Sequence, residues 1–235
     1  MSARILGLDV STCTGYGFWI SDRDVSSIDA GVIELPAAKT YFDPRTKEEK
    51  HDYSWDDWRV AQVGPKILKL LQRTKPEFVL IEERLRFSKT GDNSFAMTQA
   101  IHGAILSHCC TMGIAFGTIY SQSWRSAAYP DGFKQPLLPA LDRNGKQKVN
   151  KETGKLEFKK KDWGDIAVEK CEELGVQLPP QKSIAHNAAE AALIAMVWRC
   201  KNRISIPASR DQAKYKALLE RSPRAARPEP MGAAA

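Results

Sequence analysis

Asp9 ends an apolar run, ILGLD, and is followed by Ser, Thr and Gly before a second apolar run begins. A carboxylate at the end of a buried strand is costly unless something compensates its charge. Glu82 has the same setting in the run FVLIEE. If the two strands are neighbours, both carboxylates meet at the carboxyl edge of the sheet, where open α/β sheets place their ligands.

Two carboxylates in such a place repel each other, and one would take up a proton unless a cation lay between them. The sequence around them offers oxygen ligands and no cluster of Cys or His residues. Hard oxygen ligands favour Mg²⁺ or Mn²⁺ over zinc. The pattern therefore predicts a divalent metal site that begins with Asp9 and Glu82.

Glu190 is the only acidic residue in the apolar run from Ile184 to Trp198. A buried glutamate without a partner is strongly destabilising, so it needs a metal, a cation or a solvated cleft. His186 and Asn187 lie four and three residues before it, a spacing that places all three on one helix face. Two alternatives stay open: a salt bridge from Glu190 to an arginine, and a histidine that serves only the core or the helix surface.

The apolar patterns predict an α/β fold with a mixed five-stranded sheet, in the order βββαβαβα, flanked by helices. We expect strands over 4–10, 16–21, 27–36, 76–83 and 114–121, and helices over about 58–71, 94–112, 161–175 and 183–202. The polar stretch before the first helix is expected to be a loop that turns into that helix. Residues 1–206 are predicted to form one domain, and 207–235 a flexible basic tail with one short helix.

Residues 130–161 are predicted to be a basic insertion before the last helices. From 134 to 161, nine Lys or Arg residues stand against three acidic ones, so this segment holds most of the net charge of +7. Such a lysine density favours contact with a phosphate backbone, and a solvated insertion without a ligand is the alternative. The turn signals DRNGKQ and KETGKL indicate a twisted hairpin or a mobile loop.

The five cysteines form no CxxC pair and read as reduced thiols. No signal peptide and no apolar stretch of about 18 residues is present, so we expect a soluble cytoplasmic protein with no membrane partner.

Five blocks occur in the order found in RuvC-like Holliday junction resolvases of the ribonuclease H-like superfamily. They are ILGLDVSTCTGYGF, FVLIEE, QSWRSA, KKKDWGDIAVEKCEELG and HNAAEAALIA, within roughly residues 4–200. The chain resembles a divergent member of this family, which implies a ribonuclease H-like fold and a four-acid site for two Mg²⁺ or Mn²⁺ ions. Asp9, Glu82 and Glu190 match three of the acids, although the family usually has aspartate at the third. Asn187 stands where the family generally has Asp or His, so His186 or Asn187 would complete the ligand set.

The resemblance also implies a catalytic lysine near the scissile phosphate, just before the penultimate helix. Lys159, Lys160 and Lys161 all qualify, and we take Lys160 and Lys161 as the candidate catalytic residues. The family's aromatic wedge is replaced by Leu85, with Phe87 nearby. The predicted DNA contacts are Lys146, Lys148, Lys155, Lys159 and Phe87.

The implied activity is a metal-dependent endonuclease that makes paired nicks in a four-way DNA junction by two-metal phosphodiester hydrolysis. Symmetric cutting needs two active sites and so implies a homodimer. The implied interface is the helix 94–112, whose Met97, Ile101 and Ile105 are equally well core residues. One alternative is a non-catalytic nucleic-acid-binding protein on the same fold. Another is an ATP-dependent kinase of the actin-like superfamily, which would need a second lobe of the same fold.

Overall fold

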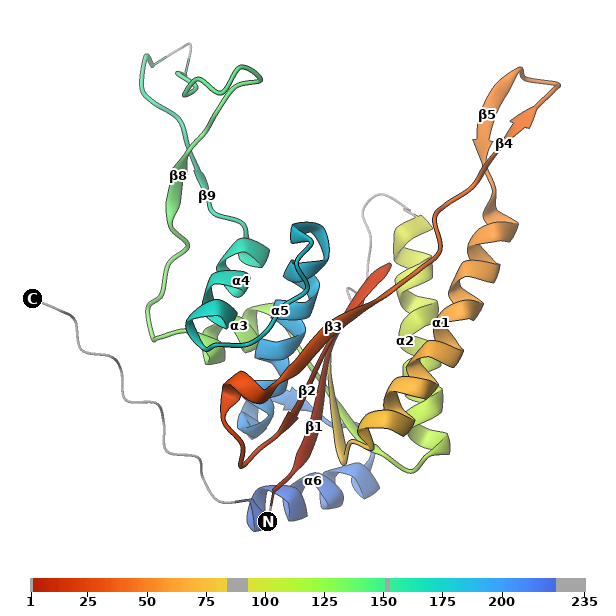
Figure 1. Cartoon of the computed structure of the whole chain (residues 1–235), viewed down its shortest axis with the longest axis vertical. Coiled ribbons are helices and arrows are strands. Elements are labelled where there is room, and N and C mark those ends of the chain that lie inside the picture. Colours follow the sequence, from red (N-terminus) through yellow and green to blue (C-terminus); the bar gives the residue numbers. More distant parts are fainter. Residues whose placement is uncertain (1, 84–92, 151–152, 223–235) are drawn as a thin grey trace, which may run out of the picture.

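The central sheet has three antiparallel strands at one edge and parallel strands at its centre (Figure 1). The computed structural model describes residues 2–83, 93–150 and 153–222. The strands of the sheet are β1 (Arg4–Asp9), β2 (Cys13–Ile20), β3 (Asp29–Glu34), β6 (Phe78–Glu82), β7 (Ala115–Ile119) and β10 (Ile204–Ser205), in the spatial order β10-β7-β6-β1-β2-β3. β6 runs parallel to both β1 and β7, whereas β2, β3 and β10 pair in antiparallel fashion.

The predicted α/β fold with a mixed sheet flanked by helices is confirmed, and the sheet has one strand more than expected. All five predicted strands are present, and β10 adds a sixth next to β7. Because β10 has only two residues, it shows no alternation of apolar and polar positions in the sequence.

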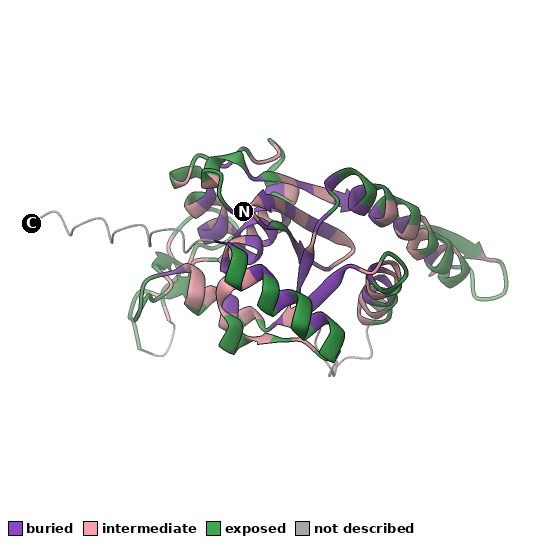
Figure 2. Ribbon diagram, turned by 90° about the horizontal axis from the view of Figure 1, so that it is seen from below, coloured by how far each residue is buried: buried purple, intermediate pink, exposed green. Residues whose placement is uncertain are grey.

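Helices cover both faces of the sheet. One face carries α1 (Tyr53–Thr74) and α2 (Asn93–Thr111), and the other carries α3 (Ser121–Ala128), α4 (Trp163–Glu173) and α5 (Lys182–Met196) (Figure 1). Along β1, Leu6 and Leu8 belong to the core under α1 and α2, while Ile5 belongs to the core on the α5 side. Figure 2 shows the buried strands between helices whose outer faces are exposed. The strand alternation therefore assigns each side chain of β1 to one of two cores.

Helix α5 lies unusually close to the sheet because both partners offer small residues where they meet. A Cβ on Gly7 would lie 2.5 Å from the backbone nitrogen of Ala195, and one on Gly17 would lie 2.5 Å from Cα of Ala192. Neither position leaves room for a side chain. This close contact brings the residues of α5 to the carboxyl edge of β1.

The stretch expected to be a loop forms a hairpin of β4 (Thr40–Asp43) and β5 (Glu48–His51) instead. Tyr41 and Phe42 are more than half exposed, so the sequence has no alternating apolar pattern that would predict these strands. Asp56 at the start of α1 is buried and binds both His51 and Arg59. This contact ties the end of the hairpin to the helix.

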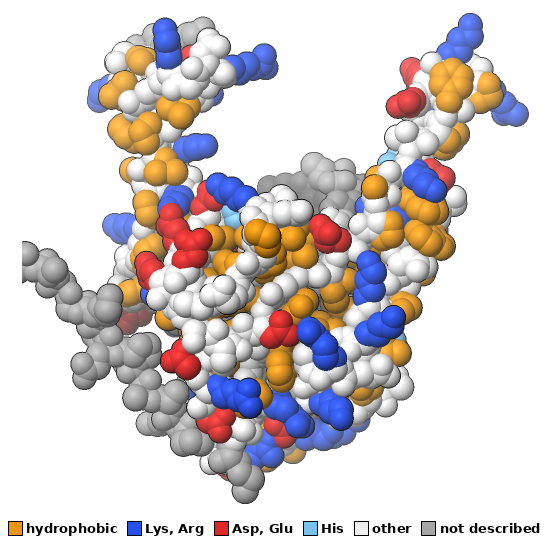
Figure 3. All heavy atoms as spheres, in the orientation of Figure 1, with side chains coloured by type: hydrophobic (Ala, Val, Ile, Leu, Met, Phe, Trp, Pro, Cys, Tyr) orange, Lys and Arg blue, Asp and Glu red, His pale blue; other side chains and the backbone are white. Residues whose placement is uncertain are grey.

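The basic insertion is a twisted hairpin, as one of the two alternatives predicted. Its strands β8 (Leu137–Pro139) and β9 (Phe158–Lys160) are antiparallel, and Leu141–Gln147 and Val149–Leu156 bridges extend the pairing. We call residues 134–161 the basic arm. It projects from the same end of the molecule as the β4–β5 hairpin, with Lys and Arg side chains along it (Figure 3).

The segment expected to be a flexible tail from residue 207 contains α6 (Ser209–Arg221), which packs on the domain. Tyr215 and Leu218 are each 5% exposed, and the Tyr215 hydroxyl donates to the Trp198 carbonyl oxygen at 2.5 Å. The short 3-10 helices are η1 (Val25–Ser27), η2 (Val197–Arg199) and η3 (Lys201–Arg203). Across the described residues, no helix combines the length and apolar character that crossing a membrane requires.

Candidate active site

Asp9, Glu82 and Glu190 converge at the carboxyl edge of the sheet. Leu8 of β1 is paired with Ile81 of β6, so Asp9 and Glu82 follow side by side at the ends of adjacent parallel strands. By strand alternation both face the side covered by α5, which carries Glu190. One carboxylate oxygen from each of the three lies within 4.8 Å of the other two. The three acids proposed from the sequence thus form one group, which we call the acid cluster.

The electrostatics of the acid cluster favour a bound cation. Burial raises the pKa of Asp9 well above its usual value, and the charges of Glu82 and Glu190 raise it further, while Arg125 lowers it. Burial also raises the pKa of Glu190, against the opposing charge of Arg125. Mutual repulsion of buried carboxylates is what a divalent ion with hard oxygen ligands relieves. The donor set therefore fits Mg²⁺ or Mn²⁺.

Helix α3 supplies the hydrogen-bond partners of the acid cluster. Glu82 accepts a hydrogen bond from the Ser121 hydroxyl and one of 3.3 Å from the indole nitrogen of Trp124. Glu190 accepts one of 3.1 Å from Arg125, so the salt bridge considered for it is present beside the other two acids. The sequence block QSWRSA contains Trp124 and Arg125, and Ser121 directly precedes it, yet nothing in the composition of this stretch assigned these donors a role.

Aromatic rings hold the Arg125 guanidinium in place. Its central carbon lies 5.0 Å from the ring centroids of both Trp124 and Trp163. Such stacking on two indoles fixes the orientation of a planar guanidinium. Its Nε is buried and has no hydrogen-bond partner among the described residues. Arg125 is a residue of the candidate site that the sequence reasoning missed, as are Ser121 and Trp124.

The structure does not bring His186 to the acid cluster. Its Nε2 lies 3.1 Å from Oδ1 of Asp165 in α4, and its ring packs against Gly164. His186 lies one helical turn from Glu190, as its spacing in the sequence predicts. Its imidazole, however, binds α4 and not the acid cluster. The Asn187 side chain instead lies near Cys13 at the start of β2: burial raises the pKa of this thiol, and Asn187 opposes the rise. As a metal ligand, Asn187 stays a prediction.

The candidate lysines lie in the basic arm and at its end. Lys161 forms an ion pair with Glu169, and Lys159 and Lys160 are exposed on β9. The next residue, Asp162, caps α4, and the ring of Trp163 after it lies 5.0 Å from the Arg125 guanidinium, which places this end of the arm near the acid cluster. Lys146, Lys148 and Lys155 are exposed further along the arm. Phe87 and Leu85 lie outside the described residues.

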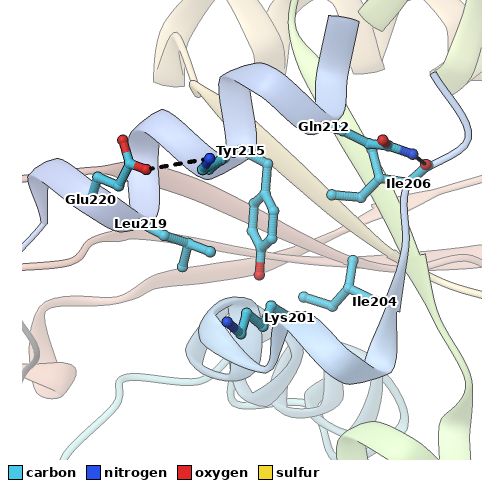
Figure 4. Close-up of a pocket in the computed structure, with 8 residues that line it drawn as sticks. Lys201, Ile204, Ile206, Gln212, Tyr215, Leu219 and Glu220 are labelled. Atoms are coloured by element: carbon cyan, nitrogen blue, oxygen red, sulfur yellow. Dashed lines mark hydrogen bonds and ion pairs between the residues drawn. The ribbon is translucent and has the colours of Figure 1, made fainter. Parts of the chain in front are cut away.

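A separate hollow of about 520 Å³ lies between α6 and the η3–β10 segment (Figure 4). Tyr215 and Ile204 point into it, and Lys216 and Glu220 form an ion pair at its rim. None of the three acids lines this hollow. It is therefore not part of the candidate active site.

Comparison with known proteins gives structural likenesses at low identity. No protein-family model matches the chain, and no curated protein sequence matches it. The structure is similar to Thermus thermophilus RuvC, with 16% identity and a TM-score of 0.48 over 86% of this chain and 99% of that one. It is also similar to T. thermophilus RuvC in complex with a Holliday junction substrate, with 14% identity and a TM-score of 0.49 over 87% and 99%. The yeast mitochondrial Holliday junction resolvase Ydc2 shows 14% identity and a TM-score of 0.43 over 93% and 84%.

These solved structures belong to the resolvases that the five sequence blocks resemble. At such identities the likeness concerns the fold, and the function of the chain is inferred below from its own residues.

Proposed function

We propose that this protein is a metal-dependent endonuclease that cuts branched DNA, with the four-way junction as its main substrate. The observation that supports this most is the acid cluster, in which three carboxylates from β1, β6 and α5 approach within 4.8 Å. A purely structural role does not account for it, because one arginine faces three carboxylates and their mutual repulsion destabilises the fold.

In this proposal Asp9, Glu82 and Glu190 hold two Mg²⁺ or Mn²⁺ ions. When bound, such ions supply an activated water and stabilise the leaving 3′ oxygen of a phosphodiester. Arg125 donates to a non-bridging oxygen of the scissile phosphate, since its guanidinium is held at the cluster by Trp124 and Trp163. Ser121 and Trp124 keep the Glu82 carboxylate oriented through their hydrogen bonds.

The basic arm holds the DNA that flanks the cut. Its exposed lysines, Lys146, Lys148, Lys155 and Lys159, contact backbone phosphates and carry no base preference of their own. Lys160 and Lys161, where the arm ends near the acid cluster, are the lysines closest in sequence to α4 and remain candidates for the scissile phosphate. Specificity comes from the shape of the junction.

Two copies of the chain are needed for paired nicks, so we propose a two-fold homodimer. Ile101 and Ile105 of α2 belong to the core of the chain itself, and Met97 is buried as well. The interface proposed on α2 therefore uses the outer face of the helix, where Ala100 is exposed.

Cleavage of labelled four-way junction, fork and linear duplex in Mg²⁺ tests the proposal. We expect symmetric nicks in the junction, lost in Asp9→Asn and kept in Asp22→Asn, a control at an exposed acid. Equal cutting of all three substrates would contradict the proposed junction specificity and support a less specific nuclease. Tight junction binding without cutting in Mg²⁺ or Mn²⁺ would leave a non-catalytic DNA-binding protein.

A further inference from the structure

A pocket of about 530 Å³ opens beside the acid cluster, between α3 and the start of α4. Ser121 and Arg125 line it, and the same two side chains bind Glu82 and Glu190. The volume is in the range of small-molecule sites, which run from about 300 to 1,000 Å³. The pocket and the acid cluster therefore share a wall.

The pocket has an aromatic lining. The rings of Tyr129 and Phe133 are stacked, with centroids 4.8 Å apart and an angle of 21° between their planes. Trp163 lies 5.6 Å from Tyr129 and 6.1 Å from Phe133. Phe133 is 40% exposed, so part of its ring is open to a ligand, while Tyr129 behind it is buried. An aromatic platform next to cations is the surface on which proteins stack single nucleobases.

Hydrogen bonds hold these walls in place without a ligand. The Gln135 side-chain amide donates to the Lys161 carbonyl oxygen at 2.9 Å and so joins the two ends of the basic arm. Arg203 donates to the Ser123 carbonyl oxygen at 3.0 Å, which fixes a second guanidinium at the rim. A site that is already ordered loses little conformational entropy on binding.

We propose that this pocket receives one unpaired nucleobase of the cleaved strand, from a nucleotide next to the scissile phosphate. The inference rests on the proposed function, since it places the phosphate of that nucleotide at the acid cluster. The basic arm begins and ends at the rim of the pocket. A DNA strand bound along the arm therefore passes the pocket before it reaches the acid cluster. A base must leave its stack to enter, and this costs least at a branch point, where pairing is already open. The pocket thus supplies both a preference for open DNA and a dependence on the base beside the cut.

Junctions with a single abasic residue, moved position by position across the branch point, test the proposal by equilibrium binding. With the wild-type chain we expect one position at which the abasic residue weakens binding about tenfold, as lost base stacking does. Phe133→Ala should weaken binding of the intact junction by a similar factor and make that abasic position neutral. Phe133→Tyr should keep the wild-type pattern, and Phe42→Ala, at an exposed aromatic of β4, should behave as wild type.

The pocket proposal is overturned if no abasic position matters to the wild-type chain, or if the loss persists unchanged in Phe133→Ala. Cleavage of the same junctions in Mg²⁺ separates this from the proposed function. Cutting without any effect of the abasic residue would overturn the pocket proposal and support the proposed nuclease activity. An effect of the abasic residue on binding that depends on Phe133, without any cutting, would support the pocket proposal and overturn the proposed nuclease activity.

Discussion

The Arg125 guanidinium lies 3.1 Å from the Glu190 carboxylate and opposes the raised pKa of both Glu190 and Asp9. One positive charge faces three carboxylates there, so the repulsion is only partly balanced. Glu190 is also the acid that comes from a helix, whereas Asp9 and Glu82 end paired strands. In the proposed mechanism, a metal bound by Glu190 would weaken this ion pair and leave Arg125 available to the phosphate.

Arg125→Ala should separate metal binding from turnover. Removing a cation beside the acid cluster leaves Mg²⁺ affinity at least as high as in the wild type. The cleavage rate at saturating Mg²⁺ should fall about 100-fold, the usual effect of losing one preorganised donor to a transition-state charge. Single-turnover cleavage across a Mg²⁺ titration gives both quantities.

Arg125→Lys should recover part of the rate, because a charge returns without the planar fork. Arg73→Ala is the matched control, since Arg73 forms an exposed ion pair with Asp29. A large loss of Mg²⁺ affinity in Arg125→Ala would show that the arginine only positions Glu190.

Metal binding should stabilise the fold more at high pH than at low pH. Asp9 and Glu190 have raised pKa values, so the metal-free folded chain binds more protons than the unfolded chain above the unfolded pKa of about 4. Stability therefore falls as pH rises from there through the folded pKa values. Since Mg²⁺ relieves this repulsion, the Tm increase it causes should be larger at about pH 8 than at about pH 5.

Asp9→Asn removes one charge from the acid cluster and is the control for that experiment. Without metal it should be more stable than the wild type at about pH 8, and Mg²⁺ should raise its Tm less. Equal Mg²⁺ shifts in both chains, measured by circular dichroism, would place the metal effect elsewhere on the protein.

Three acids could be located from the sequence because each lies in or at the end of an apolar run. Arg125 could not, since an arginine in a short polar helix is ordinary until the fold shows Glu190 beside it. The helical periodicity placed His186 one turn from Glu190, but it could not show which side chains a neighbouring helix brings to the imidazole. There Asp165 binds the imidazole.

The elements that the sequence did not indicate share a physical reason. β10 has two residues, and β4 is solvent-exposed, so neither shows an apolar period. The short helix predicted in the tail is present as α6, but its packing on the domain was not predicted, because only a few apolar residues, among them Tyr215 and Leu218, stand between charged ones. The structure of such segments is determined by their tertiary contacts and not by their own sequence pattern.

Gly7→Ala should damage the fold and the acid cluster together. The added Cβ would lie 2.5 Å from the backbone nitrogen of Ala195, so α5 must move away from β1. Overpacking of this kind costs about 1–3 kcal/mol, and displaced Glu190 should weaken Mg²⁺ binding. Thermal unfolding and metal titration measure the two effects.

Gly103→Ala is the matched control for Gly7→Ala. Gly103 is exposed on α2, and a Cβ there meets nothing within 4 Å. It should gain up to about 1 kcal/mol from helix propensity and bind Mg²⁺ as the wild type does. If Gly7→Ala behaved in the same way, the close packing of α5 would not be what positions Glu190.

Replacing Lys146, Lys148 and Lys155 by Ala should weaken junction binding and lower its salt dependence. Each phosphate contact contributes about 0.9 to the slope of log K against log salt on duplex DNA, so the slope should fall by up to about 3. The rate of cutting at saturating protein should change little, because these lysines lie away from the acid cluster. The control is Lys201, Lys214 and Lys216 replaced together. Lys214 and Lys216 belong to α6, which lies near the opposite end of the molecule from the arm (Figure 1), and Lys201 lines one hollow with α6. An unchanged slope in the arm variant, or an equal fall in the control, would mean that the basic arm does not hold the DNA.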